Sequence, residues 1–257
     1  MDFEGRFAEM QVAVYESNQA LGQAAAIEFA AILREELGKN DEAAVIFATG
    51  NSQLSFLEAL RHEKNIAWDR VIVFHMDEYL GLPADHPASF RRFIHEKITD
   101  IFHPRITYGI EGDAPNVSEE LARYTALLKA HPAVICVMGV GENGHLAFND
   151  PPADFHTNKL IHVVTLDETC RRQQVGEGHF PNFDAVPKQA LSLTVPALLQ
   201  PKHVLVLVPE SRKAKAVQAA LEGAITESCP ASILRTQKHV KLYLDRDSAA
   251  LVRDQLV

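Results

Sequence analysis

"VICVMGVGENGHLAFNDPP", residues Val134 to Pro152, joins a short apolar run to a turn that is rich in glycine and in short polar side chains. A continuous apolar run, unlike an alternating one, is typical of a strand that is covered on both faces, as in a parallel sheet. The glycines that follow allow the backbone to fold closely around a ligand, and they present one histidine, His145. We therefore expect a buried parallel strand whose carboxyl end carries a functional side chain.

Runs of the same kind recur along the chain and alternate with helical patterns. Five further strands are expected, at residues 43–50, 71–75, 161–166, 203–209 and 241–245. One helix is expected from Ser17 to Leu37, with Gly38 as its stop signal. A second is expected to begin at Ser118, and a third to follow Ser211 as its N-cap. Strands that alternate with helices predict an α/β fold with a mainly parallel, doubly wound (Rossmann-like) sheet flanked by helices.

The chain, residues 1–257, has no repeat and no clear linker, which favours a single domain. Its least regular stretch, about residues 150–190, is rich in Pro, Gly, His and Asn. Such a stretch inside a compact domain is often a lid or a binding loop. In a doubly wound sheet, ligands bind at the carboxyl ends of the strands, so we searched the residues that follow each strand.

The composition limits the class of partner. The formal net charge of −9 argues against nucleic acid or an anionic membrane as the main partner, because both favour a basic surface. The cysteines, Cys136, Cys170 and Cys229, are far apart, as in proteins of the reducing cytoplasm. The acidic start "MDFEGRFAEM" does not resemble a signal peptide, and no apolar run approaches the roughly 20 residues that span a bilayer. We expect a cytoplasmic protein.

Two strand ends offer places for a phosphate. Gly50, Asn51 and Ser52 lead from a strand into a helix, whose free N–H groups and positive dipole end suit an anion. Lys213 falls in the first turn of the helix that begins at Ser211, where a cation opposes the helix dipole unless an anion binds beside it. The alternatives are an ordinary strand-to-helix turn with a serine cap and a solvated lysine.

Another strand end carries acidic groups. The strand at 71–75 brings His75, Asp77 and Glu78 to its end. One of two adjacent carboxylates can have a raised pKa, which a general base near neutral pH needs. The alternatives are a capped, solvated turn and a metal site formed by His75 and Asp77. No metal-binding spacing such as HExxH supports the metal site.

The histidine of the opening stretch completes the set. Histidine has the unperturbed pKa nearest neutrality, so His145 can give and take a proton, and Asp150 or Glu142 could set its tautomer. The alternative is a structural histidine on a glycine-rich turn. Together the four strand ends predict one crevice with two phosphate-binding segments, a carboxylate base and a histidine. We find no GxSxG elbow, no dinucleotide fingerprint and no cysteine in a nucleophile setting.

The motifs "MDEYLGLPADHPASF" and "GVGENGHLAFNDP", in this order, resemble those of the glucosamine-6-phosphate deaminase (isomerase) family. "ATGNSQ" and "PESRKAKAVQAALEG" resemble its two phosphate-binding segments, and "VPKQALSLTVPALL" resembles a late helix-forming stretch. The resemblance extends from about residue 10 to about residue 245. It implies conversion of a hexosamine 6-phosphate and water into fructose 6-phosphate and ammonium, with no cofactor and no metal. The related 6-phosphogluconolactonases share the fold and a Gly-His turn, but usually carry a DER-type motif in place of MDEY.

Carried over by motif, the resemblance implies four catalytic residues. Asp77 would move a proton between C2 and C1 of the sugar, and His145 would open the sugar ring. Asn143 and Asp150 would orient that histidine or the substrate. The implied substrate-binding residues, which include the phosphate ligands, are Gly50, Asn51, Ser52, Glu78, Gly144, Arg172 and Lys213.

The sequence departs from the family pattern in two parts of the site. Asp150 replaces the usual glutamate and is one methylene shorter, which could loosen its contact with His145 or favour another substrate. The family's lid arginine for the phosphate has no clean match, and of Arg171 and Arg172 we prefer Arg172.

Relatives that are activated by N-acetylglucosamine 6-phosphate carry a serine pair and an Arg-x-Lys, where this chain has Ala153-Asp154 and the residues 160–162. We therefore expect no such activation, and a monomer or a dimer in preference to a hexamer. A 6-phosphogluconolactonase or another sugar-phosphate isomerase stays open as an alternative. A third alternative is a non-catalytic sugar-phosphate sensor. The presence of both Asp77 and His145 argues against it.

Overall fold

A parallel sheet forms the centre of the computed structural model, which describes residues 2–176 and 178–252. Eight strands lie in the order β1-β2-β11-β10-β7-β3-β4-β6, and all neighbours pair in parallel except β1 with β2. The bounds are β1 Phe3–Phe7, β2 Met10–Tyr15, β3 Ala43–Phe47, β4 Val71–His75, β6 Ile106–Tyr108, β7 Ala133–Met138, β10 His203–Val208 and β11 Val240–Asp245. The predicted α/β class with a mainly parallel sheet is confirmed.

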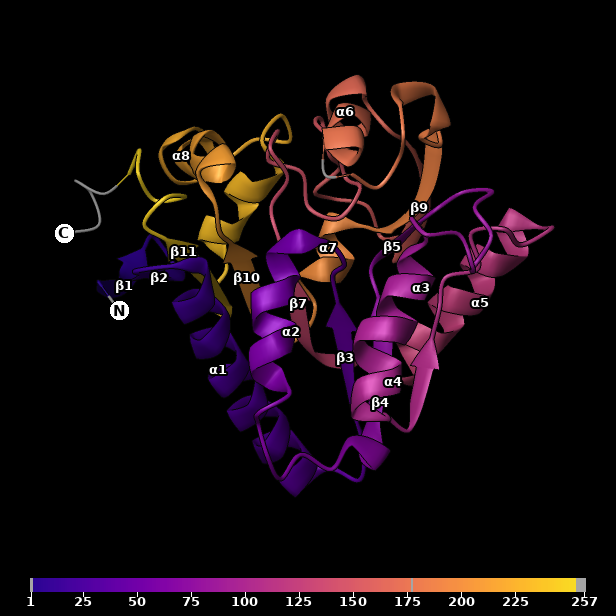
Figure 1. The fold of residues 1–257 in the computed structure, drawn as a ribbon, viewed down its shortest axis with the longest axis horizontal. Coiled ribbons are helices and arrows are strands. Elements are labelled where there is room, and N and C mark those ends of the chain that lie inside the picture. The colour runs from indigo at the N-terminus through magenta and orange to yellow at the C-terminus, as the bar shows by residue number, and fades with distance from the viewer. Residues whose placement is uncertain (1, 177, 253–257) are drawn as a thin grey trace.

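Helices cover both faces of this sheet (Figure 1). On one face lie α1 (Asn18–Lys39), α2 (Leu54–Leu60), α3 (Phe90–Ile94) and α4 (Asp100–Phe102), and their apolar side chains share a core with alternate residues of the strands. On the other face lie α5 (Val117–Ala130), α7 (Val195–Leu198) and α8 (Ala214–Glu222). The sheet is therefore doubly wound. Its inner strands are buried on both sides, which explains their continuous apolar runs, whereas the edge strands β1 and β6 are partly exposed.

The strand order reverses between β3 and β7. From β3 the chain proceeds outward through β4 to β6, and from β7 it proceeds the other way through β10 to β11. The loops that follow β3 and β7 therefore separate and leave a crevice at the carboxyl ends, which is where ligands bind in open α/β sheets.

A second, smaller layer lies over these carboxyl ends (Figure 1). It contains a three-stranded antiparallel sheet of order β5-β9-β8, with bounds Asp77–Tyr79, Gln189–Leu193 and Ile161–Thr165, and the helix α6 (Glu168–Gly176). Its own apolar cluster includes Tyr79, Phe90, Phe148 and Phe180. The irregular segment 150–190 supplies β8 and α6, so it is more regular than its composition indicates.

The strand expected at 161–166 is confirmed as β8, which pairs antiparallel in the small sheet and alternates in burial. Two other details of the sequence interpretation are wrong. Within "VPKQALSLTVPALL", residues 189–193 form a strand in place of a helix, because they fill the middle of the small sheet between β5 and β8. Gly38 does not stop α1, which continues to Lys39 and is capped by Asn40.

The starts of three helices show where the local sequence is sufficient to predict the N-cap and where it is not. Ser17 caps α1 as predicted, since its side chain accepts the N–H of Ala20. Ser118 does not begin α5, because the side chain of Asn116 accepts the N–H groups of the first turn. Ser211 is not a cap either: it begins a 3₁₀ turn that precedes α8.

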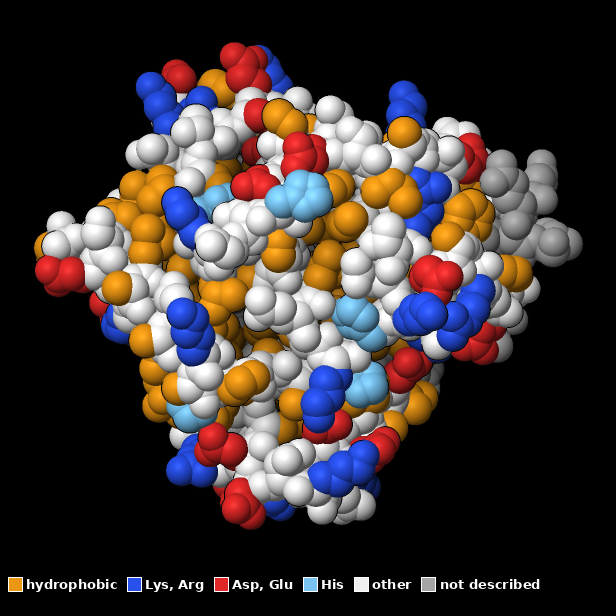
Figure 2. Space-filling model, turned by 180° about the vertical axis from the view of Figure 1, so that it is seen from behind, with side chains coloured by type: hydrophobic (Ala, Val, Ile, Leu, Met, Phe, Trp, Pro, Cys, Tyr) orange, Lys and Arg blue, Asp and Glu red, His pale blue; other side chains and the backbone are white. Residues whose placement is uncertain are grey.

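No helix in the described part of the chain has the length and apolar character needed to span a bilayer. On the face shown in Figure 2, basic and acidic side chains are interspersed and do not gather by sign.

Candidate active site

The carboxyl ends of four strands open into one cavity. Its walls come from the segments after β3, β4, β7 and β10, together with α6 and the loop that follows it. Of the expected site residues, the cavity is lined by Gly50, Asn51, Ser52, Asp77, His145 and Lys213. The four strand ends that the sequence singled out therefore meet in space.

Asp77 follows β4 and is nearly fully buried in the cavity wall. Its Oδ1 has no hydrogen-bond partner among the described residues. Burial raises the pKa of Asp77 well above its ordinary value, and the neighbouring charge of Glu78 raises it further. A carboxyl group in this setting can accept a proton closer to neutral pH than an exposed aspartate does.

Glu78, expected to bind substrate, lies outside the cavity wall. Its fully buried carboxylate accepts the Ser89 hydroxyl at 2.8 Å and the N–H of Arg91 at 2.8 Å. It also accepts the N–H of Phe90 at 3.2 Å, so it holds the start of α3. Burial raises the pKa of Glu78, although these hydrogen bonds oppose that effect. Its expected contact with substrate stays a prediction.

His75 does not form a metal site with Asp77. Its ring is fully buried and does not line the cavity, and its Nε2 accepts the N–H of Ile110 at 2.8 Å. Burial lowers the pKa of His75 to about 3, so the ring is neutral. The residue acts as part of the packing around the base of the site.

The turn after β7 positions His145. The N–H of Gly141 bonds to the carbonyl of His145 at 2.9 Å, and this closes the turn over the ring. A Cβ on Gly141 would lie 2.2 Å from the ring atoms of His145, so only glycine leaves room for the imidazole. The glycine-rich sequence around the histidine is thus a steric requirement.

Behind the ring lies a network of polar groups. Oδ1 of Asp150 is 3.1 Å from Nδ1 of His145, a close polar contact between carboxyl group and imidazole that does not have the geometry of a hydrogen bond. Asn143 donates to Asp150 at 3.1 Å and to Asp167 at 3.2 Å, and it accepts the N–H of His145. Burial opposes ionisation of Asp150, but the His145 and Asn143 contacts and the N–H of Asp167 outweigh it and hold the pKa of Asp150 below its ordinary value.

Gly144, expected to bind substrate, is also outside the cavity wall. It has a φ of 85° and packs against Cys229, and its carbonyl accepts the N–H of Ala231. Glycine is required at this position because the backbone of the turn is left-handed there. Its expected contact with substrate likewise stays a prediction.

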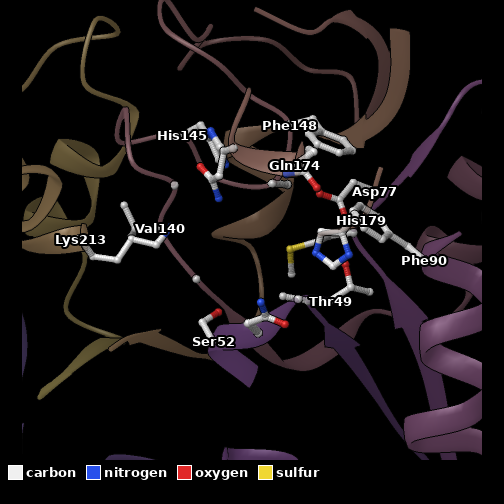
Figure 3. A pocket seen from close by; sticks show the side chains of 18 of the residues that line it. Thr49, Ser52, Asp77, Phe90, Val140, His145, Phe148, Gln174, His179 and Lys213 are labelled. Atoms are coloured by element: carbon white, nitrogen blue, oxygen red, sulfur yellow. The ribbon is translucent and has the colours of Figure 1, made fainter. Parts of the chain in front are cut away.

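The opposite side of the cavity suits an anion. Gly50 has a φ of 101°, and Asn51 and Ser52 begin the 3₁₀ turn that leads into α2. Lys213 is buried yet reaches the cavity wall, and Arg212 lies beside it with ion pairs to Glu210 and Glu142. Figure 3 shows Lys213 and Ser52 on the side of the cavity away from Asp77.

Neither expected lid arginine reaches the cavity. Arg172 is exposed and pairs with Glu168 one helical turn away. Arg171 is buried against the Phe183 ring at 3.9 Å and donates to the carbonyls of Phe183 and Val186. Neither side chain lines the cavity in this structure, and a role of Arg172 in phosphate binding stays a prediction.

The sequence interpretation missed several lining residues. They include Thr49, Phe148, Gln174, His179 and Arg212. Gln174 is anchored by a hydrogen bond from the Tyr79 hydroxyl at 2.7 Å, and Figure 3 shows His179 close to Thr49 and Asp77. Polar residues in the segment 150–190 were the available signal, but only the fold shows which of them face the cavity.

The arrangement has the groups that an enolisation needs. A buried carboxyl group and a histidine backed by a carboxylate face one cavity, and cationic side chains lie across from them. Such a site can hold a small anionic molecule by one end and move protons at the other.

A family described as glucosamine-6-phosphate isomerases/6-phosphogluconolactonase matches residues 16–244. A glucosamine-6-phosphate deaminase of Exiguobacterium sibiricum is 32% identical over 225 residues, which cover 87% of either chain. One of Bacillus thuringiensis is also 32% identical, over 87% of this chain and 84% of its own.

Solved structures give the same result. A structure described as a monomeric glucosamine-6-phosphate deaminase has a TM-score of 0.85 and 31% identity, covering 94% of this chain and all of the other. A 6-phosphogluconolactonase of Shewanella baltica has a TM-score of 0.77 at 19% identity, covering 94% of this chain and all of its own, and this likeness concerns the fold alone.

Proposed function

Because this chain belongs to the glucosamine-6-phosphate isomerase/6-phosphogluconolactonase family, we propose that it is a glucosamine-6-phosphate deaminase. The observation that carries the proposal is the placing of Asp77 and His145 on the wall of one cavity that Lys213 also lines. The substrate is glucosamine 6-phosphate, and the products are fructose 6-phosphate and ammonium.

The phosphate binds at the starts of α2 and α8. Ser52 and the N–H groups of its 3₁₀ turn donate to phosphate oxygens, and Lys213 supplies the positive charge. Arg212, which the sequence interpretation missed, stands beside Lys213 on the wall and adds to the positive field. Anchoring the phosphate at this end sets the sugar carbons against Asp77 and His145.

His145 opens the sugar ring. It takes the proton of the C1 hydroxyl and returns a proton to the ring oxygen, which breaks the C1–O5 bond and leaves an aldehyde at C1. Asp150 holds the imidazole in place and stabilises its charged form during the transfer. Asn143 positions Asp150 through its amide.

Asp77 then moves a proton from C2 to C1. Loss of the C2 proton to the carboxylate, while one proton of the C2 ammonium group passes to the O1 oxygen, gives an enolamine. Return of the proton from Asp77 to C1 then gives a protonated imine at C2. Water adds to C2, and ammonia leaves to give the ketone. Each step transfers a proton or adds water, so the reaction itself needs no redox cofactor.

The segment 150–190 is the lid in this proposal. It carries Gln174 and His179 on the cavity wall, and it contributes Asp167 to the network behind His145. Closure over the substrate would exclude water from the enolamine until the imine forms. We further propose that the chain works in the cytoplasm.

The test is ammonia release from glucosamine 6-phosphate, with galactosamine 6-phosphate and 6-phosphogluconolactone assayed in parallel. The proposal requires ammonia from the glucosamine ester. Ammonia from the galactosamine ester alone would change the substrate and keep the reaction. Hydrolysis of the lactone without ammonia from either ester would replace the proposal by the lactonase activity.

A further inference from the structure

Within residues 2–176 and 178–252, one group of three side chains could hold a metal ion: His145, Asp150 and Cys170. Their ligand atoms all lie within 4.8 Å of one another, and the residues are buried or half-buried. His145 and Asp150 come from the turn after β7, whereas Cys170 comes from the first turn of α6. The three side chains therefore link the turn after β7 to α6.

The spacing is close to that of a tetrahedral zinc site. Two ligands that bind zinc at about 2.0–2.1 Å with a tetrahedral angle lie about 3.4 Å apart, and a thiolate lies about 3.6 Å from each of them. Nδ1 of His145 and Oδ1 of Asp150 are 3.1 Å apart. A movement of Cys170 Sγ by roughly 1 Å or less would complete three ligands, which leaves the fourth position to water.

The donor atoms and their surroundings favour a soft divalent cation. Nδ1 of His145 is buried and has no aligned hydrogen-bond partner among the described residues, so its lone pair or proton is available for exchange. The N–H of Cys170 donates to Oδ1 of Asp167 at 2.6 Å, so a second carboxyl group lies close to the three side chains. Carboxylates beside a thiol attract a cation, and a bound cation favours the thiolate form.

We propose that His145, Asp150 and Cys170 form an inhibitory site for zinc or a similar transition-metal ion. The metal occupies Nδ1 of His145 and separates it from Asp150, so the imidazole can no longer be charged and oriented for proton transfer. Binding of the metal depends only on these three side chains. The inhibition rests on the proposed deaminase function.

Cobalt(II) tests the binding directly, because cobalt bound by a thiolate gives a charge-transfer band in the near ultraviolet and visible bands of tetrahedral character. The apo protein is titrated with cobalt(II), and zinc is then added to displace it. The parent protein should give the band, and Cys170→Ser should not. Cys136→Ser and Cys229→Ser are matched controls that should keep it, since neither cysteine belongs to the group.

A band that survives in Cys170→Ser, or that disappears in a control variant, would overturn the proposal. So would the absence of any band from the parent protein at millimolar cobalt(II). Far-ultraviolet circular dichroism confirms that each variant is folded, so a missing band reports on the ligand and not on the fold.

The second arm measures turnover against free zinc. Zinc should inhibit the parent enzyme, and a chelator should restore the rate. In Cys170→Ser a hydroxyl of similar size replaces the thiol. This variant should keep its turnover in the absence of zinc, and at least about tenfold more zinc should be needed to inhibit it. Equal sensitivity of the two proteins would refute an inhibitory role. A cobalt band in a protein that releases no ammonia would separate failure of the proposed function from failure of the metal site.

Discussion

Asp77 and Glu78 are neighbours in the chain and both carry buried carboxyl groups, yet only Asp77 lines the cavity. Successive side chains of a strand point to opposite sides, so one carboxylate reaches the ligand side while the other holds α3. The different partners separate the two roles: Glu78 accepts hydrogen bonds from the start of α3, whereas Oδ1 of Asp77 has no hydrogen-bond partner among the described residues.

We expect Asp77→Asn to lower kcat by about 10²–10⁴-fold with a smaller effect on KM, because it removes the base and keeps the shape of the side chain. Steady-state assays of ammonia release would show this. A variant that keeps parental turnover would exclude Asp77 as the base.

The same variant should change the pH dependence of stability. The folded-state pKa of Asp77 is raised, so the parent protein loses stability as pH rises from the ordinary aspartate range through that raised pKa. Asp77→Asn lacks this loss. Its Tm relative to the parent should therefore increase as pH rises through this window. A difference in Tm that is the same at every pH would contradict this expectation.

For Asp150→Asn we expect a loss of turnover on the order of 10² or more, since an amide cannot stabilise the charged imidazole. Because the pKa of Asp150 is lowered in the folded protein, its contribution to stability is present at neutral pH and is lost as pH falls through the folded pKa. Thermal unfolding should show a smaller stability deficit of the variant at acid pH than at pH 7.

At the scale of elements, the starts of α2 and α8 form the anion site. Lys213→Ala should raise KM for glucosamine 6-phosphate by about 10–100-fold, the range for loss of a hydrogen bond to a charged group. Arg172→Ala serves as the matched control, because its side chain is exposed and points away from the cavity. Substrate-dependence curves of both variants check this. An equal rise of KM in the control would return Arg172 to the binding site.

The packing of α1 on α2 depends on one glycine. A Cβ at Gly22 would lie 2.5 Å from the backbone of Ser55, whereas a Cβ at Gly38 in the same helix meets no atom within 4 Å. Gly22→Ala should therefore cost about 1–3 kcal/mol of unfolding free energy through overpacking. Gly38→Ala should stabilise by about 0.5–1 kcal/mol, because alanine is the better helix former. Urea unfolding of the pair measures both, and equal effects would refute the packing argument.

At the scale of the whole molecule, we expect a monomer or a dimer in preference to a hexamer, because the chain lacks the residues of the activator site. We also expect no activation by N-acetylglucosamine 6-phosphate, because Ala153-Asp154 and the residues 160–162 lack the serine pair and the basic residues of activated relatives. Light scattering after size-exclusion chromatography and rate assays with this ester test the two statements. A hexamer, or a sigmoidal rate curve that the ester makes hyperbolic, would contradict them.

The sequence alone determined the class of fold and the strand ends that carry the site. Both depend on local patterns: a strand covered on two faces must be apolar throughout, and a turn over an imidazole must contain glycine at Gly141. The resemblance of the motifs to a family was equally local, because it rests on short contiguous stretches.

Only the tertiary structure decided which polar side chains face the ligand. Arg171, Arg172 and Gln174 lie within four positions of α6, but the phase at which the helix packs over the small sheet turns Gln174 to the cavity and the arginines away. Pairing of β5 with β9 likewise sets the direction of Asp77 and Glu78. Direction depends on long-range register and helix phase, which arise from contacts between segments that are far apart in the chain.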